Sequence, residues 1–127
     1  MKKDHTRDYT TEIFRLYARR KDEPVLSGGQ IADISAADRT LRRLRDAGRD
    51  EIVRAVERIY FVQPFRPLRK KEITERVIAY AIACPTDERN VYRWLKTART
   101  LCAYFRGLTL AAGEIEKIKA FIEEEKK

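Results

Sequence analysis

Apolar residues recur every three or four positions along almost the whole of this 127-residue chain. This spacing is typical of amphipathic helices, and no stretch shows the alternation of apolar and polar residues that a half-buried strand requires. The pattern therefore predicts an all-α protein of about six short helices. Four of these helices are expected over residues 9–21, 70–83, 87–106 and 114–127. The second is expected around the apolar residues Ile34, Ala37, Leu41 and Leu44, and the third from Asp50 to the segment 63–67 that ends it.

Glycine, proline and serine residues predict where several of these helices begin and end. The stretch VLSGGQ, with two glycines at 28–29, is expected to form a loop, and Ser35 is expected to cap the second helix. Gly48 and Gly107 are expected to end the second and fifth helices, because glycine readily adopts the left-handed conformation found there. Two prolines in the 63–67 segment favour an extended connection before the fourth helix.

Residues 77–96 have the pattern of a helix-turn-helix, in which two helices joined by a tight turn cross closely. Ala81 is small enough to allow the close crossing. Pro85 disfavours a continued helix in the turn, and Thr86 is expected to cap the second helix of the pair. Four apolar residues are expected to pack the pair together, namely Tyr80, Cys84, Val91 and Trp94. An ordinary helical hairpin is the alternative interpretation.

The second helix of this pair carries side chains that suit a DNA major groove. Arg89, Asn90 and Arg93 are expected to contact base edges, since arginine can pair with guanine, and asparagine with adenine, through two parallel hydrogen bonds. Further basic residues, at the start of the fourth helix or farther along the fifth, are expected to contact phosphate. They are Arg66, Arg69, Lys70, Lys71, Lys96 and Arg99. The alternative for each of them is a cation that only solvent surrounds.

The net charge of +8 supports this interpretation once it is located along the chain. Residues 39–106 carry seventeen Lys and Arg against eight Asp and Glu, whereas residues 1–38 are balanced and residues 107–127 carry four against five. All of the positive excess therefore lies in the stretch that contains the suspected motif, as expected for a surface that binds phosphate. A solvated, arginine-rich helical surface is the other explanation.

Other classes of function have little support. The only histidine is His5, near the N-terminus, and no glycine-rich phosphate loop follows a strand, so we expect no enzyme activity, no metal site and no cofactor. The apolar runs are too short to span a membrane and the N-terminus lacks a signal peptide, which together predict a cytoplasmic protein without membrane contact. Cys84, Cys102 and Trp94 are expected to be buried, with both cysteines reduced.

Residues 50–108 also resemble a known family. The segments EIVRAVERIYF, PLRKKEITERV and DERNVYRWLKTARTLCAYFRGL are similar to phage-encoded ArpU/RinA-type transcriptional regulators, whose C-terminal half is similar to region four of sigma factors. The resemblance implies an all-α DNA-binding protein, from a phage or prophage, that activates transcription. It also implies that the helix at 87–106 enters the major groove. The residues that this places on DNA are Arg89, Asn90, Arg93 and Lys96.

The expected organisation has three parts. Residues 1–49 form an N-terminal helical region of open role, residues 50–110 a DNA-binding region with the helix-turn-helix, and residues 111–127 a C-terminal amphipathic helix. The core is expected between the third, fourth and fifth helices, with the first two helices as an N-terminal addition.

The expected function is that of a transcriptional regulator that reads double-stranded DNA and contacts RNA polymerase or another protein. A homodimer is left open. One alternative is a small helical interaction or assembly factor whose basic surface meets an acidic partner. The other is a DNA-packaging or recombination accessory that uses the same motif without controlling transcription.

Overall fold

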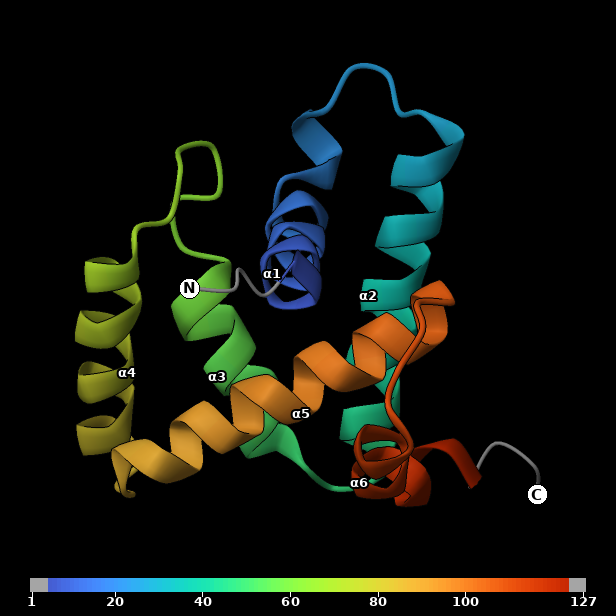
Figure 1. The fold of residues 1–127 in the computed structure, drawn as a ribbon. Coiled ribbons are helices and arrows are strands. Elements are labelled where there is room, and N and C mark those ends of the chain that lie inside the picture. The colour runs from blue at the N-terminus through green and yellow to red at the C-terminus, as the bar shows by residue number, and fades with distance from the viewer. Residues whose placement is uncertain (1–4, 124–127) are drawn as a thin grey trace.

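The computed structural model describes residues 5–123 and confirms the all-α fold, with no strand among those residues (Figure 1). The helices are α1 (His5–Ala18), a 3-10 turn η1 (Arg20–Asp22), α2 (Gly28–Asp46), α3 (Asp50–Tyr60), α4 (Lys70–Ala83), α5 (Glu88–Arg106) and α6 (Ala112–Glu123). The fourth helix has the predicted bounds, and the fifth begins one residue later than predicted. The third begins at Asp50, as predicted, and ends before the segment 63–67. The predicted end of the sixth helix, at residues 124–127, lies outside the described residues.

α5 is the central helix of the fold. It contacts each of the other five α-helices, and its most extensive contact is with α2. In Figure 1 it crosses in front of α3 and α2, with α4 at its N-terminal end and α6 beneath its C-terminal half. A helix in this position needs a broad apolar side. Accordingly, seven of the 19 residues of α5 are buried, all of them from Val91 onward.

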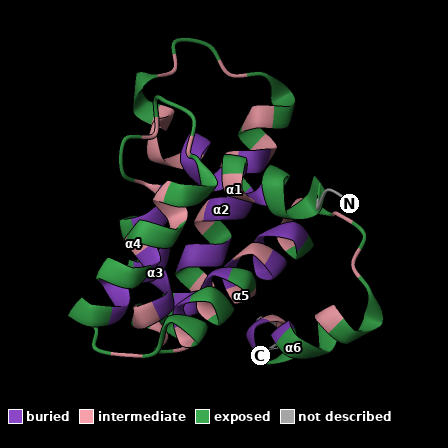
Figure 2. Cartoon of the chain, turned by 60° about the vertical axis from the view of Figure 1, so that its left-hand side comes forward, coloured by how far each residue is buried: buried purple, intermediate pink, exposed green. Residues whose placement is uncertain are grey.

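The core is wider than the sequence predicted. Ile13 and Phe14 of α1, and Ala37 and Leu41 of α2, are at most 1% exposed and belong to the same apolar cluster as the buried residues of α3 and α5. Figure 2 shows buried segments of α1, α2, α3 and α5 gathered in the interior of the molecule. The expectation of a core limited to the third, fourth and fifth helices was therefore wrong, because the apolar sides of α1 and α2 are covered only by packing against the rest of the chain.

α2 begins earlier than expected. The Ser27 hydroxyl accepts a hydrogen bond of 3.1 Å from the backbone N–H of Gln30, and the side-chain carbonyl of Gln30 accepts one of 2.9 Å from the N–H of Ser27. This reciprocal pair satisfies two backbone donors at the start of the helix. The predicted loop at 28–29 and the predicted cap at Ser35 were wrong, because the capping box outweighs the weak helix preference of two glycines. Ser35 lies exposed within α2.

Gly48 and Gly107 end α2 and α5, as predicted. Their φ angles are +74° and +87°, in the left-handed region that other residues rarely adopt. The N–H of the residue after each glycine bonds to the carbonyl five residues earlier, at 2.8 Å after Gly48 and 2.9 Å after Gly107. Each glycine therefore lets the chain turn back while the last carbonyls of the helix keep their partners.

The two cysteines lie in different environments. Cys102 is buried, as predicted, and burial raises the pKa of its thiol to about 12. Cys84 is exposed, so its predicted place between the fourth and fifth helices was wrong. It stands at the C-terminal cap of α4, directly before the turn, where the chain leaves the packed side of the helix.

Candidate nucleic-acid interface

α4 and α5 are joined by a turn at residues 84–87. Asp87 caps α5, because its side chain accepts a hydrogen bond of 2.8 Å from the backbone N–H of Arg89. Thr86, the predicted cap, instead accepts a hydrogen bond of 3.0 Å from the side-chain amide of Asn90, so this prediction was wrong by one residue. The carboxylate of Asp87 also places negative charge at the positive end of the α5 dipole, which favours it as the cap.

α3, α4 and α5 contact one another in all three pairs. Ala81 and Val91 are buried in one apolar cluster, as a close crossing of α4 and α5 requires. The ring of Tyr80 lies edge-on to that of Trp94, with centroids 6.4 Å apart, and the Tyr80 hydroxyl donates a hydrogen bond of 2.9 Å to the carbonyl of Glu51. Trp94 is only half-buried, so it joins α4 to α5 at the edge of the core rather than filling its centre.

The outer side of α5 carries three of the predicted DNA-contacting residues. Arg89, Arg93 and Lys96 are exposed, and spacings of four and three residues place them on one face of the helix. None of these three forms an ion pair with an acidic residue of the described part of the chain. Asn90 is half-buried. Its side-chain nitrogen donates a hydrogen bond to the Thr86 hydroxyl, and its side-chain oxygen accepts one of 3.4 Å from Nη1 of Arg93.

A second basic group lies at the start of α4. Arg69, Lys70 and Lys71 are exposed, and none of them pairs with an acidic residue within 5–123. Arg66 differs, because its guanidinium binds both carboxylate oxygens of Glu72, at 2.9 and 2.5 Å. These hydrogen bonds lower the pKa of Glu72 from 4.5 to about 2. The positive charge that remains unpaired here is therefore that of Arg69, Lys70 and Lys71.

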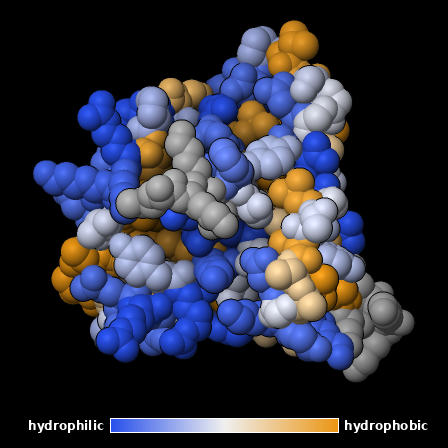
Figure 3. Space-filling model, viewed as in Figure 1, coloured by the Kyte–Doolittle hydropathy of each residue, from blue (hydrophilic) through white to orange (hydrophobic). Residues whose placement is uncertain are grey.

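The two basic groups lie at opposite ends of α4. This helix has 14 residues, so its ends are about 20 Å apart. In Figure 3, hydrophilic side chains cover both the start of α4 and the first turns of α5. Between them α4 exposes two apolar side chains, Ile78 and Ile82. The structure thus places the predicted base contacts and most of the predicted phosphate contacts on two separate patches.

Arg99 lies apart from the exposed face of α5. It is half-buried, and its guanidinium donates a hydrogen bond of 2.9 Å to the Tyr60 hydroxyl. Arg99 also lines a cavity of about 510 Å³ together with Tyr92 and with Lys70 of α4. Side chains of α1 line the same cavity. The sequence did not predict this neighbourhood, because α1 is far from α4 and α5 along the chain.

Sequence analysis also missed three arginines that hold the loop before α4. Arg15 and Arg19 of α1 and Arg76 of α4 donate hydrogen bonds of 2.5–3.3 Å to six backbone carbonyls of this loop and its approach. Arg15 makes three of these bonds and is only 1% exposed. The six carbonyls belong to Ile59, Tyr60, Val62, Gln63, Pro64 and Arg66.

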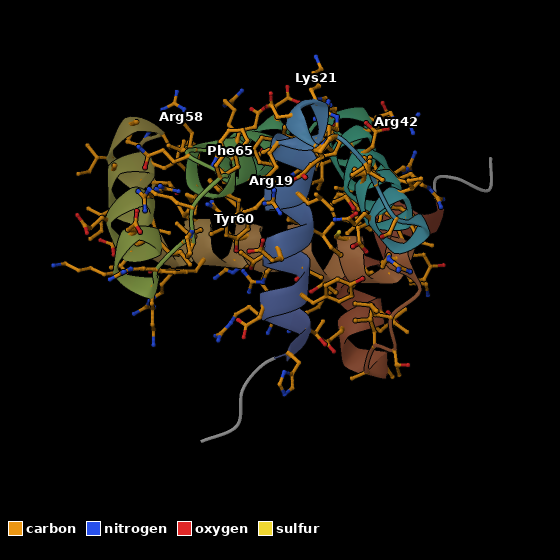
Figure 4. All side chains as sticks on the ribbon, turned by 90° about the horizontal axis from the view of Figure 1, so that it is seen from above. Arg19, Lys21, Arg42, Arg58, Tyr60 and Phe65 are labelled. Atoms are coloured by element: carbon orange, nitrogen blue, oxygen red, sulfur yellow. The ribbon has the colours of Figure 1, made fainter. Side chains whose placement is uncertain are left out.

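These inward hydrogen bonds leave apolar side chains of the loop exposed. Phe65 is 70% exposed and Val62 is 44% exposed. Figure 4 shows Phe65 beside Arg19, between α4 and α1. Gln63 has a φ of +50°, the only positive φ of a residue other than glycine in the described chain. The one sequence signal for this arrangement was an arginine within the apolar run IFRLY, and helical periodicity alone assigns it no partner.

Within residues 5–123, no group of three or more His, Cys, Asp or Glu side chains could hold a metal ion. None of the helices in that range has the length and apolarity needed to cross a membrane. No protein-family model, curated protein or solved structure matches the chain.

Proposed function

We propose that this protein is a DNA-binding transcriptional regulator in which α4 and α5 act as a helix-turn-helix. The observation that carries the proposal is the outer face of α5, where Arg89, Arg93 and Lys96 are exposed without an acidic partner in the described chain. The opposite side of the same helix is buried against the core, so the three cations are held on a fixed support. A rigid helix with a cationic outer face suits the major groove.

The length of exposed helix supports this geometry. From Glu88 to Thr97 the outer side of α5 is open, and ten residues of helix span about 15 Å. The major groove is about 12 Å wide, so this segment is long enough to cross it. In this arrangement the side chains of Arg89 and Arg93 reach base edges. Asn90 joins them once its amide leaves Thr86.

The acidic residues at the start of α5 favour a base contact for Arg89. Asp87 and Glu88 lie next to it, and both are exposed. Their carboxylates repel phosphate, so the backbone of the DNA avoids this end of the helix while an uncharged base edge does not. The guanidinium of Arg89 is then placed for guanine rather than for phosphate.

Phosphate contacts are assigned to the other cations. Arg69, Lys70 and Lys71 lie about 20 Å from the start of α5, at the far end of α4, where the first helix of such motifs meets the DNA backbone. Lys96 is assigned to phosphate on the other side. Arg66 and Arg99 contribute only if they exchange their present partners, Glu72 and Tyr60, for DNA.

The regulatory part of the proposal depends on the resemblance to ArpU/RinA-type regulators of phages. That resemblance supports a phage or prophage origin, action on transcription and a contact with RNA polymerase. A role on DNA also fits a cytoplasmic location and needs no catalytic residue.

A low-salt binding experiment with random duplex DNA tests the proposal. Four phosphate contacts, from Arg69, Lys70, Lys71 and Lys96, predict that the affinity falls with a log–log slope of about −3.5 as salt increases. Between 50 and 200 mM salt the affinity should therefore decrease by about two orders of magnitude. Fluorescence anisotropy with a labelled duplex measures this slope. No binding at 50 mM, or a salt-independent affinity, would show that the protein does not act on duplex DNA.

A second candidate function is that of a helical interaction or assembly factor. The exposed Phe65 and Val62, on a loop that three arginines hold in place, favour this alternative. Exposed apolar groups on a fixed loop suit an apolar site on another protein, and the basic surroundings suit an acidic one. Such a factor needs no duplex, so the same binding experiment separates the two candidates.

A further inference from the structure

The outer face of α5 does not remain open along the whole helix. The face that exposes Arg89 and Lys96 continues to Thr100 and Ala103, at the helical spacings of four and three residues. Thr100 is 8% exposed and Ala103 is 0% exposed, although neither belongs to the main apolar side of α5. Their small side chains allow another helix to approach closely.

α6 is the helix that approaches this part of α5 (Figure 1). It is held by two buried side chains, Ile118 at 0% and Phe121 at 7% exposure. Arg43 of α2 adds a hydrogen bond of 3.0 Å from its Nε to the backbone carbonyl of Phe121. α6 therefore has a fixed position beside the cationic face of α5.

A pocket of about 400 Å³ lies where α6 meets α5. Arg93, Lys96 and Lys117 line it and supply three positive charges, against one carboxylate from Glu114. The Glu114 carboxylate is already engaged, because it accepts a hydrogen bond of 3.2 Å from the backbone N–H of Ala111 at the start of α6. Lys117 is exposed and forms no ion pair within the described chain. The pocket thus has an excess of positive charge that neither helix neutralises.

We infer that this pocket binds a DNA phosphate and that Lys117 makes α6 part of the interface. The inference rests on the proposed DNA-binding function and extends it to a helix outside the helix-turn-helix. With the first turns of α5 in the major groove, the sugar-phosphate strand at the edge of the groove passes the point where α6 covers α5. Lys96 and Lys117 hold that strand from two helices, while the start of α4 holds the strand across the groove.

The substitution Lys117→Ala tests the inference, and Lys21→Ala is its matched control. Both lysines are exposed and both substitutions remove one positive charge. Lys21 lies in η1, at the end of the molecule away from α6 (Figures 1 and 4). The affinity of each variant for one labelled duplex is measured between 50 and 200 mM salt. Circular dichroism confirms that both variants keep the helical content of the wild type.

Lys117 adds a fifth phosphate contact to the four assigned above, so the wild-type slope becomes about −4.5. Loss of this contact makes the slope shallower by about 0.9, so the decrease in affinity over this range should be about 3.5-fold smaller for Lys117→Ala than for the wild type. Lys117→Arg should restore the slope, and Lys21→Ala should leave it unchanged. If Lys117→Ala keeps the wild-type slope, or if Lys21→Ala flattens it equally, the phosphate pocket is refuted while DNA binding stands. If the wild type itself does not bind the duplex, the proposed function fails and the pocket with it.

Discussion

The guanidinium of Arg15 donates a hydrogen bond of 2.8 Å to the backbone carbonyl of Tyr60, which joins a buried cation of α1 to the last residue of α3. The same guanidinium also binds the carbonyls of Gln63 and Arg66, at 2.8 and 2.5 Å. Burial lowers the pKa of Arg15, and the three carbonyl dipoles compensate for the lost hydration. The N-terminal helix thereby fixes the loop that leads into the basic start of α4.

Replacing Arg15 with methionine should destabilise the fold. Methionine keeps much of the volume but leaves the buried carbonyl of Tyr60 without its donor, which costs about 1–3 kcal/mol. The carbonyls of Gln63 and Arg66 belong to exposed residues and lose less. We therefore expect Arg15→Met to lose at least about 1 kcal/mol of unfolding free energy in urea denaturation. Lys21→Met, at an exposed site, should change it by less than about 0.5 kcal/mol. A loss below about 1 kcal/mol for Arg15→Met would mean that water replaces the guanidinium without penalty.

The stability contribution of Glu72 should depend on acidity in a defined direction. Hydrogen bonds from Arg66 lower the pKa of Glu72 from 4.5 to about 2. A carboxylate whose pKa is lower in the folded state stabilises the fold above its unfolded pKa and loses this contribution as the pH falls through its folded pKa. The difference in stability between the wild type and Glu72→Gln should therefore be constant above pH 5 and shrink toward pH 2. An NMR titration that places the pKa of Glu72 near 4.5 would contradict the ion pair.

Glu72→Gln should also strengthen DNA binding. The substitution releases the guanidinium of Arg66 from its carboxylate partner and removes one negative charge beside Arg69 and Lys70. One additional phosphate contact steepens the log–log salt slope by about 0.9. Anisotropy titrations of the variant and the wild type on one duplex measure the difference. A weaker affinity for Glu72→Gln at 50 mM salt would indicate that the ion pair positions the start of α4 for DNA binding, and that it does not merely keep Arg66 from contacting phosphate.

Replacing Arg89 and replacing the Lys70/Lys71 pair should have different effects on DNA binding. Arg89 is assigned to a base edge, so Arg89→Ala should cost about 1–3 kcal/mol on the preferred site and relax discrimination at one position. The double substitution Lys70→Ala/Lys71→Ala should weaken all sequences alike and flatten the salt slope by about 0.9 per lost contact. Sites selected from a random duplex library by each protein compare the two effects. A changed preference for the lysine variant with an unchanged one for Arg89→Ala would reverse the assigned orientation of the motif.

Two glycines should respond in opposite directions to alanine. Gly107 has a φ of +87°, and no atom lies within 4 Å of an added Cβ, so Gly107→Ala costs only the strain of a left-handed alanine, about 1–2 kcal/mol. Gly113 lies in α6 with the same open surroundings but without a positive φ. Gly113→Ala should stabilise the fold by up to about 1 kcal/mol. Thermal unfolding measures the change in stability of each variant. A change of the same sign in both would contradict this account of the two glycines.

Local features allowed the sequence to predict much of α3, α4 and α5. The bounds of α4 follow from its apolar spacing together with Pro67 before it and Pro85 after it, and Gly107 ends α5 through its own backbone freedom. Cap residues were harder to predict, since Ser27 and Ser35, or Thr86 and Asp87, have similar local preferences. Which residue caps the helix depends on the hydrogen bonds that the folded turn completes.

The sequence predicted part of the candidate site as well. Arg89, Arg93 and Lys96 were expected on an outer face because Val91 and Trp94 were assigned to the packed side of the helix, and all three are exposed. The pairing of Arg66 with Glu72 was not predicted, because helical spacing describes neighbours within a helix and Arg66 lies in the loop before it. Lys117 was not predicted at all, since nothing in the pattern of α6 indicates which helix it covers.

The sequence by itself determined an all-α protein, the places of α3, α4 and α5 and the concentration of positive charge between residues 39 and 106. Each of these depends on residues that are near one another along the chain. Only the tertiary structure decided that Arg15 binds the carbonyl of a residue 45 positions away, that α1 and α2 share the core, and that α6 packs against the C-terminal part of α5. An amphipathic pattern requires that an apolar side be buried, and it does not specify the partner, which the joint packing of all six helices selects.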